Sequence, residues 1–320
     1  MKIIFDTMGG DQAPQAIVEG GLRAEKELGI EAYFVGEMSQ LKDLLPPDYR
    51  RPILEASQVI SNEEDPARAI RKKPNSSIVL AMKALVAGDY DGFLSAGSTG
   101  GLLAGGLFIS KRIKGFSRAA LPVALPNLRG PVLLLDSGAN MDCSGKLYLN
   151  FARMGRIYAQ NSFGIENPKV GLLNIGVEEG KGDKRTQEAF DYLKRSDLNF
   201  IGNVEARDIF TTEADVVVTD GFAGNILLKT VEGTAGLVMG MVKNQLKKNP
   251  PQKEAAAYVQ TLLGEVSQSL DYQEVGGAPL LGINHYVMKA HGNSDSKAIF
   301  NTAKQLKGLI EKDMITQMKA

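Results

Sequence analysis

The sequence predicts an α/β fold, a three-layer α/β/α sandwich built on a mostly parallel sheet. Short apolar runs alternate with amphipathic stretches of helical length along most of the 320 residues, a pattern typical of βαβ units. The runs are apolar at successive positions, as in parallel strands that are buried on both faces. A glycine-rich or polar turn joins each run to the stretch that follows. We expect a single domain over residues 1–320.

Six units of this kind follow one another. The predicted strands are Lys2–Phe5, Phe93–Ala96, Val132–Leu135, Val170–Leu173, Val216–Val218 and Tyr286–Ala290. In the same order, their turns are TMGGDQAP, GSTGG, SGANMDCSG, NIGVEEGKGDKR, TDGFAGN and HGNSDS, which are rich in residues that end strands and begin helices. The predicted helices span about 14–28, 99–113, 146–159, 186–195, a long stretch after 225, and 297–312.

Two segments need separate interpretation. Residues 92–110 carry no charge and are long enough to cross a bilayer, but their glycines and serines favour a strand, a turn and a buried helix. Between about 242 and 272 a helix ends at Pro250 and Pro251, and a second amphipathic helix begins. We expect a helical hairpin here that projects from the sheet domain. The apolar positions of its second helix are Ala255, Val259, Leu262, Leu263, Val266 and Leu270.

The composition excludes several classes of protein. Thirty-seven basic and 37 acidic residues cancel, so no overall positive field attracts the chain to nucleic acid. One cysteine and two histidines exclude an internal disulfide and a four-cysteine zinc site and argue against a histidine-rich metal centre. Asp6 interrupts the first apolar run too early for a signal peptide, so we expect a cytosolic protein.

Polar, glycine-rich loops follow nearly every predicted strand. Because ligands of open parallel sheets bind at the carboxyl ends of the strands, these loops are the candidate site. Glycine allows close backbone approach, and each following helix offers free N–H groups, so the site suits an anion, phosphate above all. The alternative for any single residue is that it only caps a helix. The candidates are Ser98, Thr99, Gly100, Asp136, Asn140, Asn203, Asp220 and Asn225.

Common catalytic motifs are missing. The sequence contains no G-x-G-x-x-G after a strand, no G-x-x-x-x-G-K-[ST], no G-x-S-x-G and no H-E-x-x-H. Cys143 precedes a helix, but a structural role is favoured over a catalytic thiolate. An enzyme without an evident nucleophile, metal or nucleotide motif is expected to use a substrate as its nucleophile.

Seven ordered motifs identify a family resemblance. The motifs are DTMGGDQAP, SAGSTGGLL, LLDSGAN, GLLNIGVEEGKGDKRTQEA, FIGNVEARDI, ADVVVTDGFAGNILLKTVEG and VGGAPLLGINHYVMKAHGNSDSKAI. Together they resemble the PlsX family, the acyl-acyl-carrier-protein:phosphate acyltransferases, from residue 3 to about residue 304. Ser98, Ala206 and His285 stand where the family pattern has Asn, Gly and Gly.

The resemblance implies an activity without a metal or cofactor. A fatty acyl group would pass from acyl carrier protein to inorganic phosphate, and the acyl phosphate product would feed phospholipid synthesis. The implied fold is that of the isocitrate and isopropylmalate dehydrogenases, in a homodimer. Two alternatives stay open: a phosphotransacetylase-like enzyme that uses acyl-CoA, and a non-catalytic scaffold for lipid synthesis.

Three basic side chains are candidates for the chemistry. A phosphate nucleophile needs alignment, desolvation and donors for the oxyanion more than it needs a base. Lys184 is the first choice for stabilising that charge, with Lys181 as its rival, and the alternative for both is a solvated loop. His291 could donate a proton to the leaving thiolate or cap the last helix, and capping is favoured.

The expected partners follow from the implied reaction. Acidic acyl carrier protein would meet two basic clusters, Arg68, Arg71, Lys72 and Lys73, and Lys111, Arg112, Lys114 and Arg118. The product would pass to a membrane-bound glycerol-3-phosphate acyltransferase. The 242–272 hairpin has basic residues beside an apolar stripe, so it could contact an anionic membrane, the dimer partner or both. We therefore expect a cytoplasmic protein peripherally associated with the inner face of the membrane.

Overall fold

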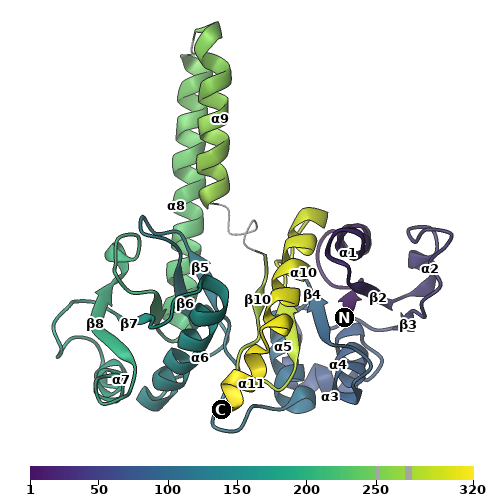
Figure 1. The fold of residues 1–320 in the computed structure, drawn as a ribbon, viewed down its shortest axis with the longest axis horizontal. Helices are drawn as coiled ribbons and strands as arrows, with labels where there is room; N and C mark the ends of the chain where they lie inside the picture. The colour runs from purple at the N-terminus through teal and green to yellow at the C-terminus, as the bar shows by residue number, and fades with distance from the viewer. Residues whose placement is uncertain (250–251, 271–275) are drawn as a thin grey trace.

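The computed structural model describes residues 1–249, 252–270 and 276–320. Two lobes lie side by side, and a long helical hairpin projects away from them (Figure 1). Each lobe contains its own sheet with helices on both faces, so the α/β class, the mostly parallel pairing and the projecting hairpin are confirmed. The strands are divided between two sheets, whereas the sequence pattern predicted one.

The first sheet has six strands in the order β10-β11-β4-β1-β2-β3. Neighbouring strands run parallel except β10, which is antiparallel to β11. The strands are β1 (Lys2–Asp6), β2 (Glu31–Gly36), β3 (Leu54–Glu55), β4 (Gly92–Ser95), β10 (Ala278–Pro279) and β11 (Tyr286–Lys289). Ile3 and Phe5 belong to one buried hydrophobic cluster and Ile4 to another, which explains why the run is apolar at every position.

The second sheet has five strands in the order β5-β6-β9-β7-β8, with only β5 antiparallel to its neighbour. Its strands are β5 (Val123–Leu125), β6 (Val132–Leu135), β7 (Lys169–Asn174), β8 (Asn199–Glu205) and β9 (Val216–Val218). Leu133 and Leu135 face the cluster that includes Phe151, whereas Leu134 packs with Leu227. Both faces are therefore buried here too.

Helices cover both faces of each sheet. The helices of the first lobe are α1 (Gln15–Leu28), α2 (Met38–Leu41), α3 (Pro66–Lys72), α4 (Ser77–Ala87), α5 (Thr99–Gly105) with a π-helical turn (Gly106–Ser110), α10 (Ser296–Glu311) and α11 (Met314–Lys319). Those of the second lobe are α6 (Gly145–Phe163), α7 (Lys184–Lys194) and α8 (Gly221–Lys248), which continues into the hairpin, together with the short 3-10 turn Ala206–Asp208. Residues 92–110 form β4, the turn and α5, as predicted.

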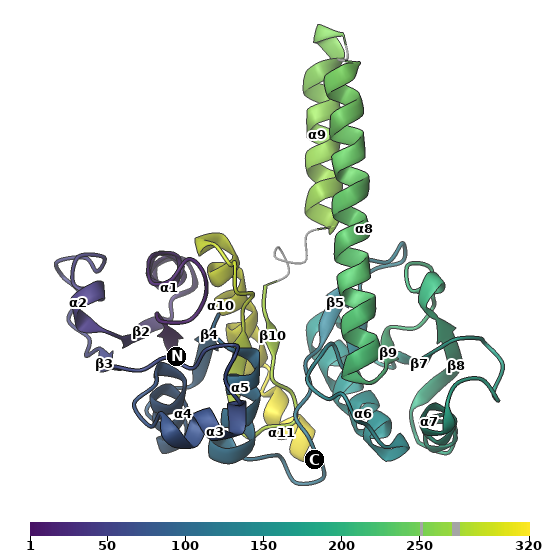
Figure 2. The same cartoon turned by 180° about the vertical axis from the view of Figure 1, so that it is seen from behind.

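The two lobes share a core. One hydrophobic cluster contains residues of both sheets, among them Phe5 and Leu135. Ala120 and Leu281 exchange backbone hydrogen bonds of 3.1 and 3.0 Å between the two lobes. The short edge strands β10 and β5 lie on the sides of the sheets that face each other (Figures 1 and 2). The presence of two sheets does not decide whether residues 1–320 fold as one unit. The single domain over these residues therefore stays a prediction.

The hairpin consists of α8 and α9 (Lys253–Leu270), which run side by side (Figure 2). The predicted turn at Pro250 and Pro251 and the end of the segment at 271–272 lie outside the described residues. In the part of the chain that the structure describes, no helix has the length and apolar content needed to cross a bilayer.

Replacing Gly224 by alanine tests the contact between α8 and the second sheet. A Cβ at this position would lie 2.0 Å from the carbonyl oxygen of Asp136. Because overpacking costs about 1–3 kcal/mol, Gly224→Ala should lower the free energy of unfolding measured in urea. Gly233→Ala is the matched control in the same helix, where the new Cβ meets no atom within 4 Å, and it should raise that energy by up to about 1 kcal/mol. Equal shifts would contradict this packing.

Candidate active site

A cavity of about 300 Å³ lies where the two lobes meet. Both sheets contribute the loops at the carboxyl ends of their strands, as the sequence predicted. The first lobe supplies Asn62, Ala96, Gly97, Thr99, Ala278, Lys289, Ala290, His291 and Gly292. The second lobe supplies Leu121, Pro122, Val123, Ser137, Gly138, Asn225, Leu228 and Lys229. The volume is within the range of small-molecule sites.

Three loops of the first lobe meet at one side of this cavity. The Asp11 N–H donates to the Gly292 carbonyl at 2.6 Å, which joins the loop after β1 to the loop after β11. The Gly97 N–H donates to Ser95 Oγ at 3.0 Å. A Cβ on Gly9 would lie 2.5 Å from the Gly97 nitrogen, so glycine is required for the loops after β1 and β4 to approach so closely.

A row of polar side chains crosses the end of the first sheet. Asp6 of β1, Ser95 of β4 and Lys289 of β11 are paired in register on adjacent parallel strands. The Ser95 hydroxyl donates to Asp6 Oδ2 at 2.6 Å. Burial raises the pKa of the Asp6 carboxyl, against the opposing effect of its hydrogen bonds. Strand pairing therefore brings an acid, a hydroxyl and an amine together next to the cavity.

The Lys289 ammonium is held by backbone carbonyls. Its Nζ donates to the carbonyl oxygens of Ala96, at 3.3 Å, and Ala290. Burial lowers the pKa of Lys289 to about 8, although the negative charges of Asp11 and Asp6 act in the opposite direction. Functional sites often contain a buried amine in a cleft whose pKa is lowered in this way.

The second-lobe side of the cavity is organised by Asp136, which is completely buried. Its carboxylate accepts hydrogen bonds from the backbone N–H groups of Leu121, Ala139 and Asn140 and from the Asn140 side chain. Burial raises the pKa of Asp136, and these bonds oppose the rise. Asp136 and Asn140 do not line the cavity. They hold the loop that places Ser137 and Gly138 there.

The cavity is lined by both polar and apolar residues. Thr99, Ser137, Asn225 and Lys289 bring hydroxyl, amide and amine groups. Asn225 is fixed because its Nδ2 donates to the Ser137 carbonyl at 3.2 Å. The larger apolar residues of the lining are Leu121, Pro122, Val123 and Leu228, with Ala278. This arrangement can hold an anion beside an apolar group.

Of the predicted site residues, Thr99, Asn225 and His291 line the cavity. Ser98 instead caps α5, since its Oγ accepts the Gly101 N–H at 3.3 Å. Gly100 is required for a different contact, because a Cβ there would lie 2.6 Å from Pro66. Neither Ser98 nor Gly100 is among the residues that line the cavity.

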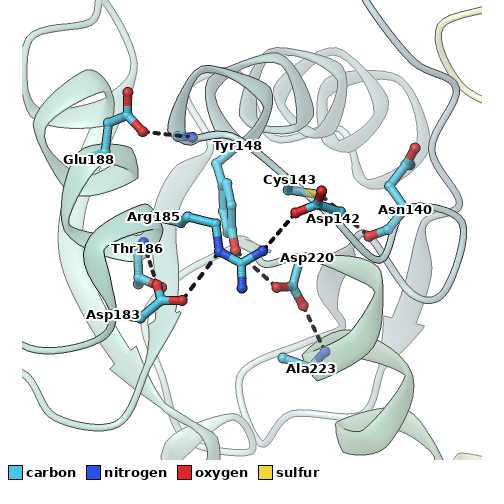
Figure 3. A network of polar contacts seen from close by, with 11 residues as sticks. Asn140, Asp142, Cys143, Tyr148, Asp183, Arg185, Thr186, Glu188, Asp220 and Ala223 are labelled. Carbon is cyan, nitrogen blue, oxygen red and sulfur yellow. Dashed lines mark hydrogen bonds and ion pairs between the residues drawn. The ribbon is translucent and has the colours of Figure 1, made fainter.

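Asp220 belongs to a polar network that joins α6 to α8 (Figure 3). Its Oδ1 accepts the Ala223 N–H at 2.8 Å, so Asp220 caps α8, and its Oδ2 accepts from the Tyr148 hydroxyl at 3.3 Å. In the same network the Cys143 thiol donates to the Asn140 carbonyl at 3.3 Å. Burial raises the pKa of Cys143 to about 12, so it stays a thiol, in agreement with the structural role predicted for it.

The two candidate lysines lie elsewhere. Lys184 is the exposed first residue of α7. Lys181 is also exposed, and its Nζ lies 3.9 Å from Glu178 Oε2. The predicted Asn203 donates to the Glu178 carbonyl at 2.8 Å. None of the three is among the cavity-lining residues. The neighbouring Arg185 joins α7 to the network of Figure 3 by bonds to Asp142 and Asp183.

The prediction that His291 caps the last helix is wrong. The cap of α10 is Asp295, whose Oδ1 accepts the Ala298 N–H at 2.8 Å. His291 lines the cavity instead, four residues before that cap. The sequence HGNSDS offers several capping residues, and only the backbone path decides which of them reaches the helix.

Lys289 is the main residue that the sequence analysis missed. It was included in the predicted strand Tyr286–Ala290 and given no role. A signal was present, because a lysine in a buried strand is rare unless it is paired or functional. Its proximity to Asp6 could not be read from the sequence, since 283 positions separate the two residues along the chain.

Comparisons with known proteins agree with this architecture. A family model described as "Fatty acid synthesis protein" matches residues 1–317. The phosphate acyltransferase of Caldanaerobacter subterraneus subsp. tengcongensis is 48% identical over the whole chain and 96% of that protein. The chain belongs to the PlsX family. The phosphate acyltransferase of Thermoanaerobacter pseudethanolicus, 46% identical with the same coverage, is a further PlsX relative. Membership makes this protein an acyltransferase of fatty acid and lipid synthesis.

Solved structures show the same fold at low sequence identity. A phosphotransacetylase from Streptococcus pyogenes superposes with a TM-score of 0.64 at 17% identity, covering 98% of this chain and 94% of that one. A protein described as a 4-hydroxythreonine-4-phosphate dehydrogenase from Salmonella typhimurium gives 0.52 at 14%, covering 97% and 100%. The dehydrogenase-like α/β fold predicted for this PlsX protein is therefore confirmed.

Asp136→Ala tests whether this carboxylate holds the second-lobe loop. The change leaves the buried N–H groups of Leu121, Ala139 and Asn140 without their acceptor. Because each buried donor left unpaired costs about 1–3 kcal/mol, we expect the free energy of unfolding in urea to fall by at least about 3 kcal/mol. The control is Asp142→Ala, whose side chain is 93% exposed and should matter little. If both variants unfold with the same urea midpoint, Asp136 does not hold the loop.

Proposed function

We propose that this PlsX protein transfers a fatty acyl group from the thioester of acyl carrier protein to inorganic phosphate. The product would be an acyl phosphate for phospholipid synthesis. The main support is the cavity itself, because hydroxyl, amide and amine side chains line it together with apolar residues. An acyl phosphate likewise joins an anionic group to an apolar chain at its reacting carbon.

The reaction needs little from the protein beyond binding and alignment. A phosphate oxygen attacks the thioester carbonyl carbon, the new C–O bond forms, and collapse of the oxyanion breaks the C–S bond. The sulfur leaves as a thiolate and takes up a proton. Donors aimed at the developing oxyanion and exclusion of water account for the acceleration. Thr99, Ser137 and Asn225 line the cavity and are suited to donate. His291 lines the same cavity, and in this proposal it protonates the sulfur.

A basic surface near the cavity supports an acidic carrier. The guanidinium of Arg71 in α3 lies 5.4 Å from the centre of the exposed Phe108 ring, so α3 meets the turn that precedes Lys111 and Arg112. This contact brings Arg71 of the first basic cluster close to the turn that leads into the second. Lys73 is paired with Glu64 at 2.7 Å and contributes less. Asn62, just before α3, lines the cavity, so a carrier bound at α3 could deliver its thioester there.

The hairpin supports a homodimer at an anionic membrane. Seven large apolar side chains between Leu237 and Val266, which we call the hairpin stripe, are exposed among the described residues of α8 and α9: Leu237, Val238, Met241, Val242, Tyr258, Leu262 and Val266. Lys243, Lys247 and Lys248 lie near its end. A single amphipathic surface helix binds lipid weakly, and two copies in a dimer bind more strongly. We place the protein in the cytoplasm at the inner face of the membrane, where a membrane-bound glycerol-3-phosphate acyltransferase would consume the product.

Thiol release with defined donors tests the reaction. Purified protein with inorganic phosphate and palmitoyl-acyl carrier protein should release free thiol in proportion to hydroxylamine-trapped acyl phosphate, and omission of phosphate should stop both. Higher ionic strength should raise the KM for the carrier, because it screens the basic surface. Release from palmitoyl-CoA or acetyl-CoA alone would favour the phosphotransacetylase-like alternative. No release with any donor would leave the scaffold alternative.

A charge in the hairpin stripe tests its role. Met241 is 61% exposed on α8, and Met241→Glu should weaken flotation with anionic liposomes, dissociate the dimer in sedimentation, or do both, because a carboxylate resists burial against lipid or protein. Gln245→Glu, an exposed polar position in the same helix, is the matched control and should do neither. A wild-type protein that is monomeric and remains unbound to liposomes would contradict both roles of the hairpin.

A further inference from the structure

We infer that the Lys289 ammonium is the cation that binds phosphate in the cavity between the lobes, rather than Lys184 or Lys181. The inference rests on the proposed function for the identity of the anion. Lys289 is the last residue of β11, whose neighbours in the sheet are β10 and β4. The backbone that carries it is therefore fixed by strands on both sides.

The cavity contains few basic side chains. Those that line it are Lys229, Lys289 and His291. Lys229 is paired with Glu232 at 2.7 Å, so its charge is already compensated. Lys289 has no ion pair within residues 1–249, 252–270 and 276–320. Its charge is thus the one most available to an anionic ligand.

The hydrogen bonds of Lys289 leave room for a ligand. An ammonium group has three donors, and two of them meet the carbonyl oxygens of Ala96 and Ala290. Both carbonyls belong to residues that directly follow strands β4 and β11, and both of these residues line the cavity together with Lys289. The third N–H has no acceptor within the described parts of the chain. A phosphate oxygen would supply that acceptor together with the opposite charge.

Two nearby carboxyl groups oppose the effect of burial on Lys289. Asp6 on β1 and Asp11 in the following loop favour the protonated amine, and burial opposes it. The Asp6 carboxylate is itself engaged by the Ser95 hydroxyl and the Met8 N–H. His291 on the next loop lines the same cavity. A bound phosphate would restore the favourable interactions that the buried ammonium lost with water, and the pKa of Lys289 would rise on binding.

The inference predicts a pH limit for phosphate binding. Because the pKa of Lys289 is lowered to about 8, the amine loses its charge as pH rises through that value, while phosphate stays an anion. Calorimetric titration of the wild-type protein with inorganic phosphate should therefore show affinity that falls above about pH 8. Affinity that stays constant or rises between pH 8 and 9.5 would overturn the inference without any variant.

Three substitutions locate the charge. Lys289→Met should weaken phosphate binding by about 10- to 100-fold, the usual loss for a charge-assisted hydrogen bond. Lys289→Arg should recover part of the affinity and abolish its fall above pH 8, because arginine stays charged. Lys83→Met, at an exposed position of α4, is the matched control and should bind like the wild type. If Lys289→Met fails to fold, the pH dependence of phosphate affinity in Lys289→Arg and in the wild type still decides whether Lys289 carries the charge.

The rival lysines and the reaction give separate outcomes. Lys184→Met and Lys181→Met should keep wild-type affinity for phosphate, and a tenfold loss in either with none in Lys289→Met would overturn the inference. Binding is measured without any acyl donor. Phosphate binding that depends on Lys289 without thiol release would therefore overturn the proposed reaction and leave the anion site standing. Thiol release that is unaffected by Lys289→Met would overturn the role of Lys289 and leave the proposed reaction standing.

Discussion

The buried carboxylate of Asp136 is the interaction on which the candidate site depends. It accepts the N–H of Leu121, in the segment that enters the second lobe, and those of Ala139 and Asn140 in the loop after β6. The carbonyl of the same residue lies where a side chain on Gly224 would be, so α8 is fixed at the same point. One residue therefore positions three of the segments that form the second-lobe side of the cavity.

Asp6 has a comparable place in the first lobe. It ends β1, is buried, and accepts from the Met8 N–H at 3.1 Å and the Ser95 hydroxyl. Both carboxyls lie at the carboxyl end of a central strand, and burial raises the pKa of both. Hydrogen bonds from loops compensate that burial. The polar residues that the sequence places after the strands thus act mainly as organisers of the loops, and few of them reach the cavity.

The division of the strands into two sheets creates the cavity. In a single continuous sheet, neighbouring loops would form one edge. Here the edge strands β10 and β5 face each other, and the loops after β4 and β11 lie opposite the loop after β6 and the start of α8. Both lobes bring polar groups to the cavity, Lys289 from the first and Ser137 with Asn225 from the second, and most of the apolar lining comes from the second lobe.

The sequence by itself determined the α/β class, the six strand–turn–helix units, the hairpin and the family, because these depend on local periodicity and on motifs a few residues long. It also predicted a site at the carboxyl ends of the strands, and Thr99, Asn225 and His291 of its candidates line the cavity there. It missed β2, β3, β5, β8 and β10, and all of these except β2 are edge strands, which need no continuous apolar run. Only the tertiary structure decided which loops face each other. Residues that cap helices and residues that line the cavity are of the same types, so the sequence could not distinguish Ser98 and Asp220 from Thr99 and Asn225. Lys289 lies beside Asp6 through strand order alone, and strand order depends on contacts between segments far apart in the chain.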